Sequence, residues 1–101
     1  MNQMDDEERK ERVELEVGSI RNSGELHLLL QEGLDFPDYY GMNWDAFWDA
    51  ITGLVELPET VVFIGWERMM AVLPNDARML SDMFTQFNEE HPLWECEVKY
   101  E

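Results

Sequence analysis

The chain has 101 residues and a hydrophobic content of 45%, which suits one globular domain with a single core. Acidic residues number 23 and basic residues 7, so the formal net charge is −16 at pH 7. A field of this sign repels nucleic acid and anionic lipid and attracts a basic partner. We therefore expect no direct binding to nucleic acid or to a membrane, although the simplest role of the charge is to keep the protein soluble.

Several features of the sequence are typical of a cytoplasmic protein. The apolar runs fall well short of the roughly 20 residues that cross a bilayer. The N-terminal stretch MNQMDDEERKERVE is charged where a signal peptide is apolar. The single cysteine, Cys96, cannot form an internal disulfide bond, which agrees with a reducing compartment. We expect Cys96 to be a small buried hydrophobic residue.

The chain begins with a charged segment and a strand pattern. Residues 1–12 are dense in charge and lack apolar periodicity, so they are expected to form a flexible charged tail outside a single domain of residues 13–101. Val13, Leu15 and Val17 alternate with two glutamates. This alternation predicts a strand with one face in solvent.

The next two segments carry helical signals. Ser23 is predicted to cap a helix that ends at Gly33, because leucines recur between them at helical spacing. A loop with proline and glycine follows, and Asn43 is predicted to be the N-cap of a second helix over residues 44–52. Gly53 is expected to end this second helix.

The second half of the chain contains two further strand patterns. Residues 61–64, VVFI, are apolar throughout, which predicts a strand covered on both faces or central in its sheet, and residues 94–100 alternate as an edge strand does. Between them lie a short helical pattern over 66–73 and a longer one that begins at Asn75 or Asp76. This order predicts an α/β domain with a three-stranded parallel sheet, its second strand in the middle, packed by about four helices.

Asp45 and Asp49 lie four residues apart on the second predicted helix, so they share one face of it. Exposed like charges at this spacing cost roughly 0.2–0.5 kcal/mol. Such a pair can hold Mg²⁺, but the segment YYGMNWDAFWDAITG has no Lys, Arg or His, and Mg²⁺ sites usually include a bound phosphate. We expect no metal here and keep a Mg²⁺-dependent enzyme only as a rival interpretation.

Nothing else in the sequence indicates catalysis. Cys96 lies between two glutamates, which raise its pKa and weaken the thiolate as a nucleophile. His27 lies among the leucines of the first helix and is more simply structural, and His91 adjoins a proline at a helix end. The sequence has no glycine-rich phosphate loop and no nucleophile elbow. We expect a protein without enzymatic activity, catalytic residues or cofactors.

Binding of a protein partner fits the aspartate pair better. Interface hot spots are rich in aromatic and charged residues, and this segment sets tyrosines and tryptophans around two carboxylates, which are good acceptors for Arg and Lys. The simpler alternative is that the aromatic residues are core and the aspartates a solvated face. Phe47 and Ile51 are expected to form the buried stripe, and at least one large aromatic residue is expected to be exposed.

The stretch FPDYYGMNWDAFWDAITGLVELP, residues 36–58, resembles the barstar family of cytosolic, bacterial inhibitors of secreted ribonucleases. The string Pro-x-Tyr-Tyr-Gly-x-Asn-x-Asp-Ala-x-Trp-Asp-x-x-Thr-Gly runs without a gap. The similarity extends over nearly the whole chain after residue 12 and is weaker in the final third. It implies a compact domain with a three-stranded parallel sheet packed by helices, as the element order also predicts.

The resemblance implies a binding site as well. In this family the second helix and the loop before it plug a ribonuclease active site, with acidic groups where substrate phosphates would lie. By its place in the motif, Asp49 is the central acceptor for basic residues of the enzyme, with Asp45 beside it. The other implied surface residues are Tyr39, Asn43, Trp48, Thr52, Gly53, Leu54, Glu56, Gln86 and Glu90.

Three positions depart from the family pattern. Leu54 stands in place of a tryptophan, Met42 in place of a glutamate, and Gln86 in place of an acidic contact, whereas Glu90 matches. Each change removes charge or aromatic area at the rim of the implied surface. The cognate enzyme therefore need not be barnase.

The sequence thus predicts an inhibitor, an immunity protein or antitoxin, that is monomeric when free. Its expected partner is a basic secreted ribonuclease or other nuclease toxin, whose active site it occludes in the cytoplasm. Two alternatives stay open. One is an immunity protein for a toxin that is not a ribonuclease, and the other is an acidic regulator that mimics nucleic acid.

Overall fold

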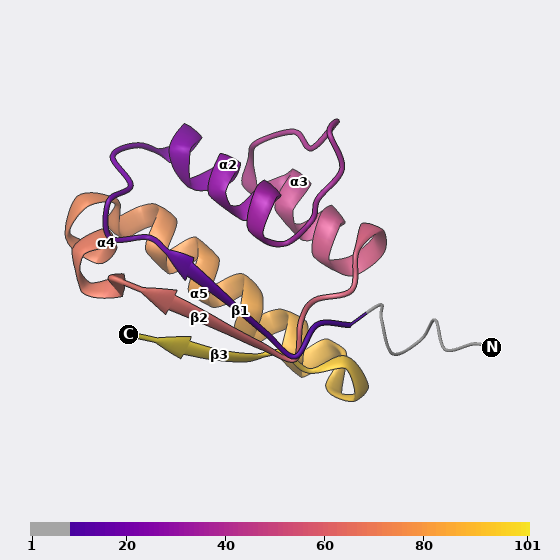
Figure 1. Cartoon of the computed structure of the whole chain (residues 1–101). Helices are drawn as coiled ribbons and strands as arrows, with labels where there is room; N and C mark the ends of the chain where they lie inside the picture. The colour runs from indigo at the N-terminus through magenta and orange to yellow at the C-terminus, as the bar shows by residue number, and fades with distance from the viewer. Residues whose placement is uncertain (1–8) are drawn as a thin grey trace.

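The computed structural model describes residues 9–101 (Figure 1). Most of the predicted charged tail, residues 1–8, lies outside the described residues. The end of that segment belongs to the fold, because Arg9 Nε donates to the Leu57 carbonyl at 3.0 Å and the first strand already begins at Arg12. Arg9 and Arg12 therefore contribute to the described fold.

One sheet of three parallel strands forms the centre of the fold, in the order β1-β2-β3. The strands are β1 (Arg12–Glu16), β2 (Thr60–Ile64) and β3 (Glu97–Tyr100). In the register, Val61 of β2 lies opposite Val13 on one side and Val98 on the other. The predicted parallel sheet, with the VVFI segment in the middle and the C-terminal strand at an edge, is confirmed.

Four α-helices pack with this sheet in the described part of the chain. The helical elements are α2 (Ser23–Gly33), α3 (Trp44–Asp49), the π-helical turn η1 (Ala50–Leu54), α4 (Trp66–Val72), α5 (Pro74–Glu90) and the 3₁₀ turn η2 (Pro92–Trp94). Figure 1 shows α4 and the C-terminus at the carboxyl end of the strands. No helix of residues 9–101 is long and apolar enough to cross a membrane.

Three element boundaries differ from the prediction. Helix α5 begins at Pro74 rather than at Asn75 or Asp76, because the fixed φ of proline suits the first helical position. The second helix does not end at Gly53 but continues through η1. The third strand begins only at Glu97, since the residues before it form η2 and a short extended link.

The helices cover one face of the sheet. Val61 and Phe63 of β2 are fully buried in the same hydrophobic cluster as Phe47 of α3 and Phe84 of α5. The Phe84 ring lies edge-on to both other phenylalanine rings, with centroid distances of 5.9 Å to Phe47 and 5.9 Å to Phe63. This geometry is the favourable one for aromatic pairs. One α5 side chain thus contacts both α3 and the sheet.

The other face of the sheet carries charged residues. Val62 points to this face by strand alternation, and it is fully buried although it lies outside the main cluster. Its partners in register are Glu14 of β1 and Lys99 of β3. Long charged side chains can bury an apolar neighbour under their aliphatic stems, so β2 is covered on both faces without a second helical layer.

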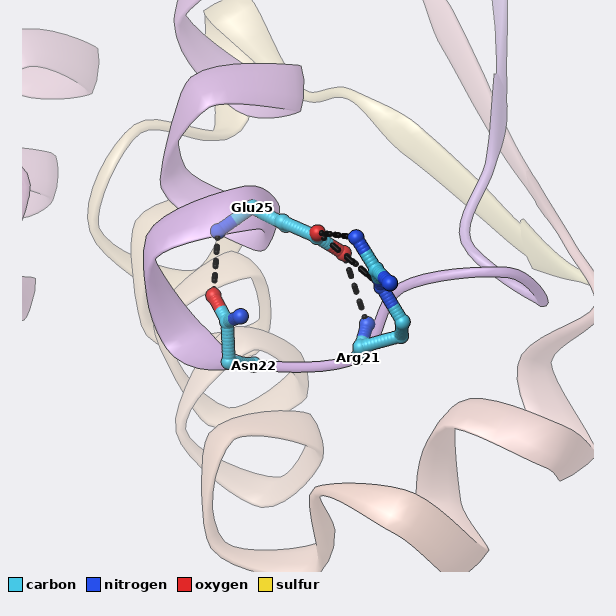
Figure 2. A network of polar contacts seen from close by, with 3 residues as sticks. All are labelled: Arg21, Asn22 and Glu25. Atoms are coloured by element: carbon cyan, nitrogen blue, oxygen red, sulfur yellow. Dashed lines mark hydrogen bonds and ion pairs between the residues drawn. The ribbon is translucent and has the colours of Figure 1, made fainter.

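The N-terminus of α2 is closed by a reciprocal set of hydrogen bonds (Figure 2). Asn22 Oδ1 accepts from the Glu25 N–H at 2.9 Å, while Glu25 Oε1 accepts from the Arg21 N–H at 2.9 Å. The Arg21 guanidinium also pairs with the Glu25 carboxylate, at 2.7 Å, and lowers its pKa. The N-cap is therefore Asn22 and not Ser23, whose hydroxyl donates instead to Asp76.

A buried polar pair holds the loop between α2 and α3. His27 Nδ1 lies 2.6 Å from Tyr40 Oη, and both side chains are buried. Burial lowers the pKa of His27, against a smaller opposing effect of Asp76, and it raises the pKa of Tyr40. The neutral imidazole is thus the folded form, in agreement with the structural role predicted for His27.

The cap assignment predicts that Asn22→Ala lowers the free energy of unfolding by about 1 kcal/mol, because the Glu25 N–H loses its acceptor. Urea denaturation followed by far-ultraviolet circular dichroism measures this loss. Asn75→Ala, at an exposed position of α5, is the control and should change stability by less than about 0.5 kcal/mol. Equal losses in the two variants would contradict the cap at Asn22.

The lowered pKa of His27 predicts that stability declines as the pH falls below the ordinary value of 6.5. In that range His27 binds a proton more readily in the unfolded chain than in the folded chain, so protonation favours unfolding. His27→Gln keeps a hydrogen-bonding group for Tyr40 but does not titrate. Denaturation midpoints measured between about pH 8 and pH 5.5 should fall more for the natural chain than for this variant, and parallel curves would refute the assignment.

Candidate partner-binding surface

Asp45 and Asp49 lie one turn apart on α3, and both are exposed. The same helix buries Phe47 and passes into η1, which buries Ala50 and Ile51. The buried stripe predicted for this segment is therefore confirmed. Because Phe47 faces the core, the helical period turns both aspartates away from it.

The two carboxylates have no local counter-charge. No lysine or arginine occurs between Arg21 and Arg68 in the sequence. Within residues 9–101, neither aspartate forms a salt bridge or a side-chain hydrogen bond. Their oxygens are thus free acceptors, with lone pairs open to a charged donor from outside.

A shallow cavity of about 360 Å³ lies between α3 and α5. It is lined by Asp45, Trp48, Asp49, Met83 and Gln86. The fold therefore brings Gln86 beside the aspartate pair, although 37 residues separate Gln86 from Asp49 in the sequence. Met83 was not among the predicted site residues, because its helical spacing on α5 marks it only as a core-facing position.

Glu90 is joined to this cavity through Gln86. The two residues lie one turn apart on α5, and Gln86 Nε2 donates to Glu90 Oε2 at 2.9 Å. Both side chains are exposed. The amide of Gln86 thus orients the carboxylate of Glu90 near the cavity that the α3 aspartates line.

A second cavity, of about 240 Å³, lies between η1 and the C-terminal end of α5. Two predicted residues, Thr52 and Glu56, line it together with His91 and Trp94, which the prediction left out. Trp94 is 51% exposed because η2, and not a strand, carries it. The only signal in the sequence for His91 and Trp94 as lining residues of this cavity was the aromatic character of the residues around Pro92. The remaining lining residues are Ile51, Val55, Leu57 and Phe87.

The other predicted residues lie outside both cavities. Tyr39 is 76% exposed in the loop before α3, which agrees with the expectation of an exposed aromatic residue, and Leu54 on η1 is 47% exposed. Gly53 is also exposed. Asn43 is the N-cap of α3, as predicted: its Oδ1 accepts from the Ala46 N–H at 2.8 Å. The side chain of Asn43 therefore already has a structural role.

The groups weighed for catalysis or metal binding lie elsewhere. Cys96 is fully buried, and its burial raises the pKa of the thiol to about 12, so the nucleophilic thiolate is disfavoured. In the described part of the chain, no three His, Cys, Asp or Glu side chains are grouped so that they could hold a metal ion. The surface is therefore distinguished by its free hydrogen-bond acceptors and its aromatic side chains.

Comparison with known proteins identifies the family of this chain. The family model described as "Barstar (barnase inhibitor)" matches residues 11–99. The chain is also similar to YrdF of Bacillus subtilis (strain 168), whose name describes it as a candidate ribonuclease inhibitor. The two are 43% identical over 65 residues, which cover 64% of this chain and 71% of YrdF. The fold, the motif around Asp49 and the match over most of the chain together show that this protein belongs to the barstar family.

Proposed function

We propose that this protein inhibits a basic ribonuclease by covering its active site with the surface formed by α3, η1 and α5. The family description and the name of the Bacillus subtilis relative both support a ribonuclease as partner. The observation that carries the proposal is the pair of free carboxylates, Asp45 and Asp49, beside Trp48 and Gln86 in one cavity. The protein itself acts by binding, without catalysis.

The mechanism follows from the charges. A ribonuclease active site binds phosphates and is therefore lined by basic groups, which the free carboxylates of α3 can occupy by charge-assisted hydrogen bonds. The net charge of −16 speeds the encounter with a basic enzyme. Barnase and barstar bind each other through such a charged hot spot and associate with electrostatic steering, and we propose that both effects also act in this protein.

We further infer that the protein acts in the cytoplasm as an immunity protein or antitoxin against a secreted enzyme. A second candidate is an immunity protein for a toxin of another class. Its support is the change at the rim, where Gln86 presents an amide and Leu54 an aliphatic side chain. These residues would suit a partner with fewer cationic and aromatic contacts at the corresponding positions.

The proposal predicts that Asp49→Ala weakens binding to barnase, the enzyme in the family description, by several kcal/mol. Stability should change little, because the substitution also removes the repulsion of Asp45. Inhibition of RNA cleavage by barnase, titration calorimetry and urea denaturation measure these quantities. Equal binding with reduced stability would show that Asp49 is structural.

Asp82→Ala is the matched control, since it removes the same charge from an exposed position of α5. It should leave inhibition almost unchanged. Equal losses in the Asp49 and Asp82 variants would instead indicate a nucleic-acid mimic that depends on total charge. Absence of inhibition by excess natural chain would refute the proposal for enzymes of the barnase type.

A further inference from the structure

The carboxylate of Asp76 joins the N-terminal ends of three helices. Asp76 lies in the first turn of α5, Ser23 is the first residue of α2, and Trp44 is the first residue of α3. The Trp44 indole N–H donates to Asp76 Oδ1 at 2.9 Å, and the Ser23 hydroxyl donates to Asp76 Oδ2. Both oxygens are therefore used, each by a different helix.

Helix α3 depends on such contacts for its orientation. Together with η1, into which it continues, it forms a helical segment of residues 44–54, still too short for a stable helix in isolation. Its buried apolar anchors are Phe47, whose ring packs edge-on against Phe84 of α5 at 5.9 Å, and Ala50 and Ile51 of η1. Such apolar contacts fix the position of the segment better than its tilt, because apolar contact has little directional preference.

The Trp44–Asp76 hydrogen bond is directional, and it therefore restrains the tilt of α3. Its acceptor is charged and both side chains are partly buried, conditions under which a hydrogen bond is short and comparatively strong. The indole ring also packs against His27, with ring centroids 4.6 Å apart. Trp44 also directly precedes Asp45, so a change in its position moves the acidic face of α3.

We infer that Asp76 is a positioning residue for the partner-binding surface. By holding Trp44, it sets the tilt of α3 and thereby the directions of Asp45 and Asp49. Asp76 does this from α5, without contact with the partner. The effect on binding rests on the proposed function, whereas the effect on the orientation of α3 does not.

The first test uses the free protein. Residual dipolar couplings of backbone amides report the orientation of α3 relative to the sheet. They are measured in Asp76→Asn, which keeps the side-chain shape, and in Trp44→Phe, which removes the indole N–H. Both variants should shift the α3 couplings while those of β2 stay constant. Asp82→Asn, the same change at an exposed site of α5, should leave all couplings unchanged. Unaltered α3 couplings in both variants would overturn the inference.

The second test measures binding to barnase at a temperature where circular dichroism shows every variant to be folded. Asp76→Asn and Trp44→Phe should each weaken binding by about tenfold, and the double variant should lose no more than either single one. Additive losses would mean that Asp76 contacts the partner itself, which would overturn the positioning role. If the natural chain does not bind barnase, the proposed function fails for this enzyme, while the dipolar couplings still decide the inference.

Discussion

The burial of Phe47 is the constraint on which the candidate surface depends. Its ring contacts the rings of Phe36, Trp44 and Phe84, with centroid distances of 5.7, 5.3 and 5.9 Å, so it joins the preceding loop, its own helix and α5. Once position 47 faces the core, the helical period leaves the positions two residues before and after it on the solvent side. The like charges of Asp45 and Asp49 are therefore displayed together by the same packing that attaches the helix.

The π-helical turn after α3 extends this surface. In η1 the Val55 N–H donates to the Ala50 carbonyl at 3.1 Å, which is the wider hydrogen-bond spacing of a π turn. Such turns occur often at functional sites. Here the turn keeps Thr52 exposed and leads the chain to Glu56, where the second cavity meets Trp94. The two cavities thus lie along one helical segment, and α5 contributes residues to both.

The distribution of charge supports the same surface. Lys10, Arg12 and Arg21 pair with Asp35, Glu14 and Glu25, all outside α3 and η1. These pairs are largely exposed and contribute little to stability, but they place the cations away from the aspartate pair. Asp76 differs from the free aspartates of α3, because both of its oxygens are used within the protein. Acidic residues of this chain therefore differ in their surroundings: Asp76 accepts hydrogen bonds within the protein, whereas Asp45 and Asp49 keep their oxygens free for the proposed partner.

The order of the elements along the chain indicated the parallel sheet. Local patterns in the sequence determined the first two strands, the Asn43 cap and the shared face of Asp45 and Asp49, because alternation, capping and helical spacing act over a few residues. They did not distinguish Asn22 from Ser23 as a cap, since both residue types are suitable and only the position of α5 gave the Ser23 hydroxyl another partner. Tertiary structure alone decided which distant residues meet: Gln86 with the aspartate pair, Trp94 with Glu56, and Asp76 with Trp44. Those contacts depend on how whole helices pack against one sheet, and no short stretch of sequence contains that information.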